Sequence, residues 1–125
     1  MSQIIKIVAN NQEFKATLNE SEAAKTVYKA LPFEGTVNTW GDEIYFHVSL
    51  DISLEQSAQA ETEIGDLAYW PMGNAFCIFF GKTPASTGEK PVAAAPVNII
   101  GALSNQSDIE KLKQIREGEN IGVRI

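Results

Sequence analysis

The sequence predicts a mainly β domain in which a closed eight-stranded barrel is capped by two α-helices. Eight short segments have the composition or alternation of strands, and two have the apolar spacing of helices. No strand–helix–strand alternation runs through the chain, which disfavours a parallel doubly wound sheet. Eight strands can close into a barrel filled by side chains, and closure leaves no exposed edge. With 125 residues, the chain is expected to form one domain over 1–125.

The predicted strands are apolar or alternating runs bounded by turn residues, and they cover residues 4–8, 13–18, 35–40, 43–49, 66–70, 76–80, 97–103 and 121–125. Asn10 and Asn11 predict a hairpin turn between the first two strands. The pair Gly41-Asp42, with glycine first, suits a type II′ turn between the next two. Residues 71–74 form the turn between the fifth and sixth strands.

Helices are predicted near residues 20–31 and 108–117, each opened by a capping box: Asn19 with Glu22, and Ser107 with Glu110. Pro32 ends the first helix, and Gly118 is placed to end the second. Two longer polar or Pro- and Ala-rich segments, 51–64 and 82–96, are predicted to be surface loops.

Composition and charge exclude several classes of binding partner and of site. The net charge of −6 argues against nucleic acid or an anionic membrane, which both reward a basic face. No apolar run approaches the roughly 20 residues that span a bilayer, and the N-terminus lacks the pattern of a secretory signal. Cys77 is the only cysteine, which excludes an internal disulfide and a cysteine-based metal cluster. We therefore expect a cytoplasmic protein without a metal or cofactor.

Three segments carry a resemblance to a known family: VNTWGDEIYF (37–46), GDLAYWPMGNAFCIFFGKTP (65–84) and VNIIGAL (97–103). Together they resemble the cyclophilin-like family of small prokaryotic proteins, which shares the cyclophilin barrel and has no assigned function. The resemblance covers nearly the whole chain in order. It implies a closed, mainly antiparallel eight-stranded barrel capped by two helices, as the pattern of elements does independently.

True cyclophilins are prolyl cis–trans isomerases, and the resemblance implies that their catalytic arginine is missing here. In cyclophilins this arginine follows a Phe-His pair in a barrel strand. Here Phe46-His47 is followed by Val48, while Arg116 and Arg124, the only arginines, stand outside the motif. His47 is a poor replacement for a permanently charged, planar guanidinium. Catalysis is therefore expected to be weak or absent.

The apolar wall of the cyclophilin groove is better matched. The Asn-Gly-Ser-Gln-Phe-Phe strand of the family can be laid on residues 74–79, which puts Phe79 in the wall and Cys77 in place of the glutamine. Matching the Phe-Phe pair instead puts Phe80 in the wall. A slip of one residue exchanges the two faces of a strand, so both alternatives remain open.

The candidate binding residues gather where aromatic strands meet turns. Tyr69 and Trp70 stand at a strand end and combine an apolar ring with a polar tip, as a half-open site requires, although rings in such runs also fill cores. Glu43, Tyr45 and His47 share one side of a strand, either as a polar row in a cleft or as a solvated face. The predicted binding site comprises Trp40, Glu43, Tyr45, His47, Tyr69, Trp70, Asn74, Cys77 and Phe79.

No catalytic residue is assigned. An inert buried thiol is favoured over a nucleophile for Cys77, and one histidine alone is a weak metal ligand. The function expected is binding of a small apolar molecule or an extended peptide at the barrel mouth without strong catalysis. Changes in the 82–96 loop are expected to matter less. The alternatives are a prolyl isomerase with a non-arginine active site, and a structural subunit that buries the mouth against a partner chain.

Overall fold

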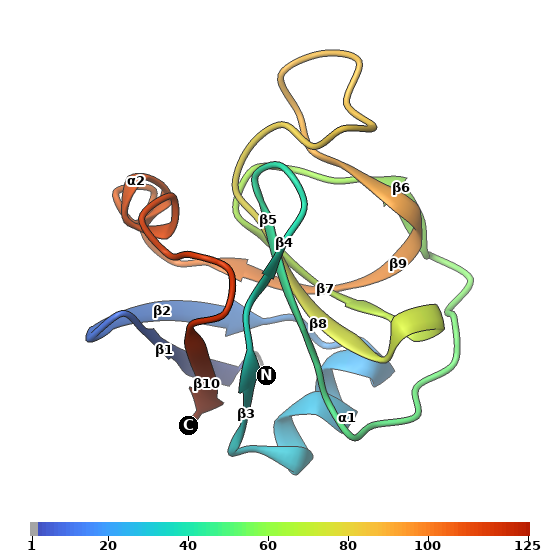
Figure 1. Cartoon of the computed structure of the whole chain (residues 1–125). Coiled ribbons are helices and arrows are strands. Elements are labelled where there is room, and N and C mark those ends of the chain that lie inside the picture. Colours follow the sequence, from blue (N-terminus) through green and yellow to red (C-terminus); the bar gives the residue numbers. More distant parts are fainter. Residues whose placement is uncertain (1–2) are drawn as a thin grey trace.

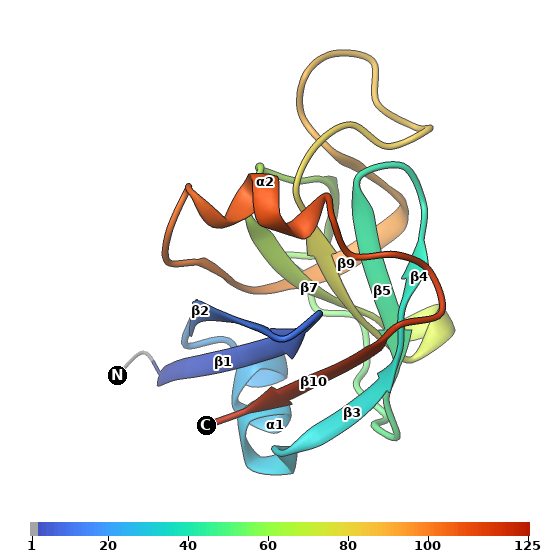
Figure 2. The same ribbon diagram turned by 60° about the vertical axis from the view of Figure 1, so that its left-hand side comes forward.

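The computed structural model describes residues 3–125, which form one predominantly antiparallel sheet and two α-helices (Figures 1 and 2). The ten strands follow the order β3-β10-β1-β2-β9-β7-β8-β5-β4, and β6 pairs with β9 beside this path. Their bounds are β1 Gln3–Ala9, β2 Gln12–Leu18, β3 Phe33–Thr36, β4 Asn38–Thr39, β5 Glu43–His47, β6 Gln59–Glu61, β7 Asp66–Trp70, β8 Ala75–Phe79, β9 Val92–Leu103 and β10 Asn120–Arg124. The helices are α1 Glu22–Ala30 and α2 Asp108–Leu112, and a 3₁₀ turn, Pro71–Gly73, joins β7 to β8.

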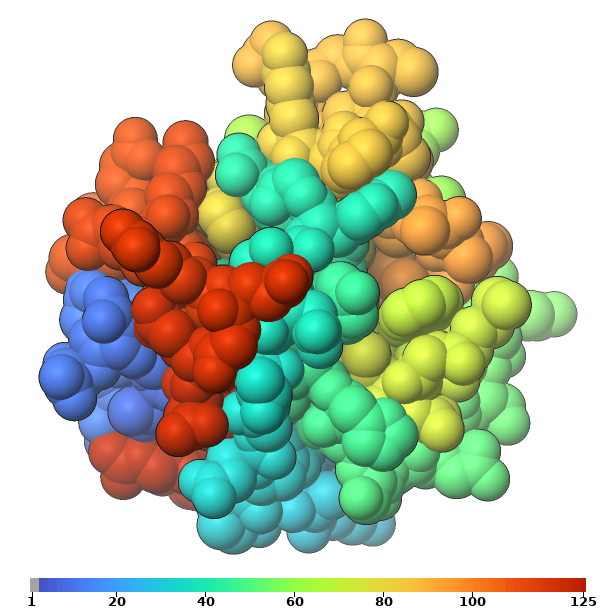
Figure 3. Space-filling model, viewed as in Figure 1, coloured from blue at the N-terminus to red at the C-terminus, as the bar shows by residue number. Residues whose placement is uncertain are grey.

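The mainly β class with two helices is confirmed, but the closed eight-stranded barrel is wrong in closure and in count. β3 and β4, the ends of the strand order, follow each other in one extended segment with only Val37 between them. β3 pairs with β10 and β4 pairs with β5, so the segment changes neighbour instead of closing a ladder on itself. Figure 3 shows this segment in cyan and teal between the red C-terminal residues and the green residues that follow β5. The count reaches ten because the strand predicted over 35–40 is divided and β6 was missed.

The two predicted hairpins form as expected because their turn residues tolerate positive φ. Asn10 and Asn11, with φ of 53° and 57°, join β1 to β2. Gly41, with φ of 62°, opens the turn before β5, and the Trp40 amide donates to the Glu43 carbonyl at 3.0 Å. A side chain at Gly41 would also meet the Lys82 carbonyl oxygen at 2.8 Å, so this position needs glycine on two grounds.

β9 begins at Val92, well before the strand predicted from residue 97, so the end of the predicted 82–96 loop is wrong. The alanines and proline of this stretch are poor strand formers, and tertiary pairing overrides that preference. The missing partner is β6, within the predicted 51–64 loop, which pairs Gln59 with Val97 and Glu61 with Val92. We call residues 92–97 the β9 arm; Figure 1 shows β9 curving away from β7 toward β6.

Both helices pack on the main core, but their predicted ends need correction. The N-cap of α1 is Ser21, whose hydroxyl accepts the Ala24 amide at 3.1 Å; the Asn19 side chain instead donates to the Ile99 carbonyl at 2.8 Å. α2 stops at Leu112, short of residue 117, and Ser107 makes no side-chain cap bond. Pro32 follows the end of α1 as predicted. Neither helix within residues 3–125 is long and apolar enough to cross a membrane.

Apolar side chains fill two separate layers on either side of β7 and β8. The larger core lies on one side and contains Phe46, Phe76 and Ile78. A smaller cluster lies on the other side, formed by Ala68, Ala75, Cys77, Phe79, Ala93 and Val97. All five residues of β8 are therefore buried, which explains why this strand reads as a continuous apolar run. The β9 arm covers the smaller cluster, and the candidate site opens beside it.

Candidate binding site

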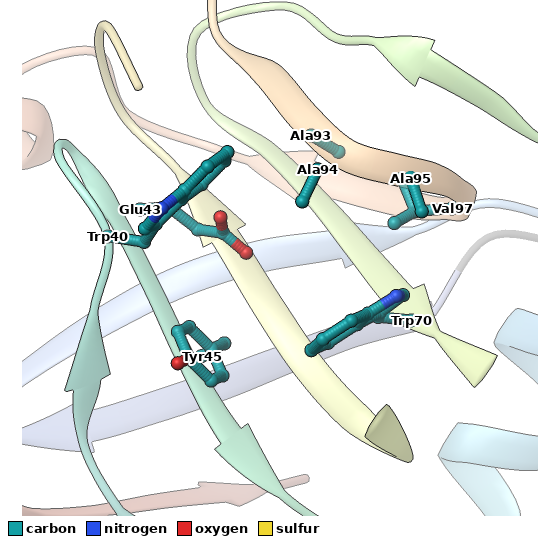
Figure 4. A pocket seen from close by; sticks show the side chains of 8 residues that line it. All are labelled: Trp40, Glu43, Tyr45, Trp70, Ala93, Ala94, Ala95 and Val97. Carbon is teal, nitrogen blue, oxygen red and sulfur yellow. The ribbon is translucent and has the colours of Figure 1, made fainter. Parts of the chain in front are cut away.

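A recess of about 130 Å³ lies between the β4–β5 hairpin and the β9 arm (Figure 4). Four of the predicted site residues meet there: Trp40, Glu43, Tyr45 and Trp70. The remaining lining comes from the β9 arm, through Ala93, Ala94, Ala95 and Val97. The recess is about as large as an engineered cavity of about 150 Å³ that holds benzene. It therefore has room for one ring or one compact branched group.

The β4–β5 hairpin sets the positions of three lining residues. Strand alternation puts Glu43 and Tyr45 on the same side of β5, and the tight turn returns Trp40 next to Glu43. The turn is tied to the chain after β8, because the Asp42 amide donates to the Lys82 carbonyl at 2.8 Å. The Asp42 carbonyl in turn accepts the Phe80 amide at 2.9 Å. These bonds hold the Trp40 backbone against the sheet.

The floor of the site is the smaller apolar cluster, and it settles which face of β8 lies on this side. Cys77 pairs with Tyr45 and Phe79 pairs with Glu43, and both are fully buried on the recess side of the sheet. Phe76, Ile78 and Phe80 belong to the main core instead. Phe79 and Cys77 are thus not exposed to the recess as ligand contacts but support the residues that line it.

The β9 arm was missed as part of the site, and its contribution is the smallness of its side chains. Ala93, Ala94 and Ala95 all line the recess, Ala93 from the buried cluster and Ala94 from an exposed position, and they leave space that larger side chains would fill. Changes in the 82–96 loop were expected to matter less, but its residues 93–95 line the recess, so substitutions there are expected to alter it. The available signal was the Ala-rich run itself, which has no turn residue between Val92 and Ala95.

The aromatic side chains surround the recess in two orientations. The rings of Tyr45 and Trp70 meet edge to face, with centroids 6.2 Å apart and planes 89° apart. Figure 4 shows the indoles of Trp40 and Trp70 nearly edge-on from opposite sides, so their faces turn toward the space between them. The Glu43 carboxylate lies between the two indoles in this view. The Trp70 indole nitrogen is buried and has no hydrogen-bond partner among the described residues.

Glu43 is the charged group of the site, and burial changes its acidity. Glu43 is only 6% exposed, and this burial raises the pKa of its carboxyl group to about 7. A hydrogen bond from the Cys77 thiol lowers the pKa by a smaller amount. The same thiol lies 3.8 Å from the Ala75 carbonyl oxygen. Burial, followed by the neighbouring Glu43 charge, raises the pKa of Cys77 well above its ordinary value, so the thiol is a poor nucleophile.

Three predicted residues lie outside the recess. Tyr69 is fully buried in the main core, because β7 turns alternate residues to opposite faces. Its hydroxyl donates to the Leu50 carbonyl at 2.9 Å and contacts the Asn74 side-chain amide at 2.9 Å, so both residues hold the segment after β5. His47 is exposed at the far end of β5, with Nδ1 3.5 Å from the Gly73 carbonyl oxygen.

The recess lacks the groups expected of a metal site or a cyclophilin active site. No lysine, arginine or histidine is among its lining residues. Arg124 pairs with Glu13, and Arg116 is exposed after α2. Within residues 3–125, no three His, Cys, Asp or Glu side chains are placed to hold a metal ion.

Comparisons with known proteins agree with this fold. A family model described as cyclophilin-like matches residues 3–124. The solution structure of a hypothetical protein from Archaeoglobus fulgidus is similar at 36% identity and a TM-score of 0.80, over 98% of this chain and 94% of that one. McbB, solved in complex with tryptophan, is similar at 14% identity and a TM-score of 0.67, over 96% of this chain and 44% of that one. A comparison with curated proteins gave no match.

Proposed function

The chain belongs to the cyclophilin-like family, and from this premise we propose that it is a cytoplasmic binding domain without strong catalysis. Its ligand is a small, largely apolar molecule or the side chain of an extended peptide, held in the recess beside the β9 arm. One observation carries the proposal: two tryptophans and a tyrosine remain partly exposed around a space kept open by alanines. Larger side chains on the β9 arm would close this space, so its alanines keep the space available to a ligand.

The recess supports modest affinity. An apolar group that buries about 100–200 Å² against these rings gains a few kcal/mol at about 25 cal/mol per Å². Association costs remove a large part of this gain. We therefore expect weak to moderate binding for a ligand held by the recess alone.

The prolyl isomerase alternative lacks a supporting observation. Catalysis of that reaction needs a donor that stabilises the imide nitrogen as the C–N bond loses its resonance. Neither Arg116 nor Arg124 lines the recess, and His47 is outside it as well. A protease-coupled assay with a proline peptide is expected to show no acceleration beyond the uncatalysed rate. Acceleration that disappears in His47→Ala would restore the isomerase function.

The binding function can be tested with Trp40→Ala and simple apolar probes such as indole and benzyl alcohol. Backbone amide shifts on titration are expected to gather in residues 40–45, 70 and 93–97. Trp40→Ala should weaken binding at least about fivefold, because it removes one wall of the recess. Met72→Ala is the matched control, since Met72 is 82% exposed and outside the recess. Shifts confined to the helices would show that the site lies elsewhere.

A further inference from the structure

Glu43 is a buried carboxylate without a cationic partner in the recess. Its neighbours on the lining are aromatic or aliphatic, and its hydrogen bond comes from the weakly donating Cys77 thiol. Lys82, whose backbone carbonyl accepts the Asp42 amide, has its ammonium group paired with Glu89 at 3.2 Å. A buried carboxylate is costly unless an opposite charge or strong donors compensate for lost water. The protein keeps this unfavourable carboxylate in the lining of an open recess, where a ligand can reach it.

The two indoles present the surfaces that a cation binds. Trp40 and Trp70 turn their faces toward the space above the Glu43 carboxylate, and Tyr45 fixes Trp70 by an edge-to-face contact (Figure 4). The face of an aromatic ring carries negative potential, and tryptophan attracts cations most strongly. A cation in this space therefore meets two aromatic faces and a carboxylate at once. A neutral ligand of the same shape gains only the apolar contact.

We propose that the recess binds an organic cation, with a substituted ammonium group between Trp40 and Trp70 and against the carboxylate of Glu43. This inference rests on the proposed function, because it assigns a ligand class to the same recess. The volume of about 130 Å³ admits a compact group such as trimethylammonium. The three alanines of the β9 arm leave room for the substituents of the nitrogen.

Binding of a cation requires the charged form of Glu43. Burial raises the pKa of Glu43 to about 7, so affinity for a permanent cation increases as the pH rises through this value. Cys77 on β8 also faces Glu43, and its raised pKa keeps the thiol neutral over this range. The phenol of Tyr45, two residues along β5, lines the recess as well. Trp70 on β7 and the alanines of the β9 arm carry no charge, and the Asp42 carboxylate lies beside Gly81 on the turn.

The experiment compares choline with its neutral carbon analogue, in which a tert-butyl group replaces the trimethylammonium group. Both are titrated by calorimetry and by tryptophan fluorescence, below and above pH 7. Above pH 7, choline is expected to bind about tenfold more tightly than the neutral analogue. Glu43→Gln should abolish this preference and its pH dependence. Glu110→Gln, which removes one negative charge on α2 outside the recess, should preserve both.

The outcomes separate this inference from the proposed function. Equal binding of choline and the neutral analogue would refute the proposal of a cationic ligand but would still support an apolar binding site. Failure of both probes, together with indole and benzyl alcohol, would overturn the binding site itself. If Glu43→Gln does not fold, Trp40→Leu provides the second test, because it keeps apolar bulk but removes the aromatic face; an unchanged preference for choline would then count against the proposal. A peptide containing trimethyllysine shows whether the cation is free or part of a chain.

Discussion

Glu43 shows how one residue links the fold to the chemistry of the site. Hairpin geometry and strand alternation place its carboxylate over an apolar floor, where 6% of the residue is exposed. Burial opposes the ionisation of Glu43, and a ligand that brings a positive charge into the recess would compensate for this cost. Tyr69, by contrast, has an equally suitable side chain but the opposite strand face, and it serves the main core.

The free energy of unfolding of the ligand-free protein should depend on pH because Glu43 is buried. The folded protein keeps the proton up to a pH of about 7, whereas an unfolded chain releases it near the ordinary pKa of 4.5. The folded state thus binds more protons between these values, and the free energy of unfolding falls as the pH rises through them. The loss amounts to about 3 kcal/mol when fully developed. Glu43→Gln should match the wild type below pH 4.5 and exceed its stability above pH 7.

Urea unfolding of both proteins at several pH values measures this difference. Using the difference cancels the contribution of other groups, including Asp66, whose pKa burial also raises. Glu110→Gln provides the control, because its side chain lies on an exposed helix surface. Stability curves for wild type and Glu43→Gln that run parallel across the whole range would contradict the assigned pKa.

At the scale of elements, β9 carries two roles along one strand. Its C-terminal half pairs with β2 and β7 in the main sheet, while the β9 arm pairs with β6 and forms one wall of the recess. The register shifts opposite Leu67 and Ala68, and a shift of this kind bends a strand. The position of the wall therefore depends on a strand whose other end is fixed in the sheet.

Filling the recess from the β9 arm should remove binding without unfolding the protein. Ala94 is exposed and lines the recess, so Ala94→Leu occupies the space without compressing the buried cluster. We expect binding of choline or indole to weaken at least about tenfold, with the free energy of unfolding within about 0.5 kcal/mol of wild type. Ala102→Leu, at an exposed position in the same strand outside the recess, is the matched control. Unchanged binding in Ala94→Leu would place the ligand elsewhere.

For the whole molecule, local signals predicted the strands and hairpins well, and non-local pairing decided the rest. Asn10, Asn11 and Gly41 are residue types that tolerate positive φ, so the sequence itself indicates their turns. β6 and the β9 arm have weak strand composition, and they form strands because they pair with each other, Gln59 with Val97 and Glu61 with Val92. The site residues divide in the same way. Strand alternation predicted that Glu43 and Tyr45 share a face, whereas the Ala-rich run at 92–95 marked a continuous segment without showing that it would lie against the recess.

The position of β10 in the strand order has a consequence for the synthesis of the chain. β10, the last strand, lies between β1 and β3, so both of these strands keep an unpaired edge until the ribosome has released residues 120–124. Exposed edges invite pairing with other chains. A chain truncated after residue 118 should therefore aggregate and lose cooperative unfolding, as light scattering and circular dichroism would show; a monomeric, cooperative truncation would refute this. The sheet stays incomplete until residues 120–124 have emerged, and the nascent protein depends on what shields the edges of β1 and β3 until then.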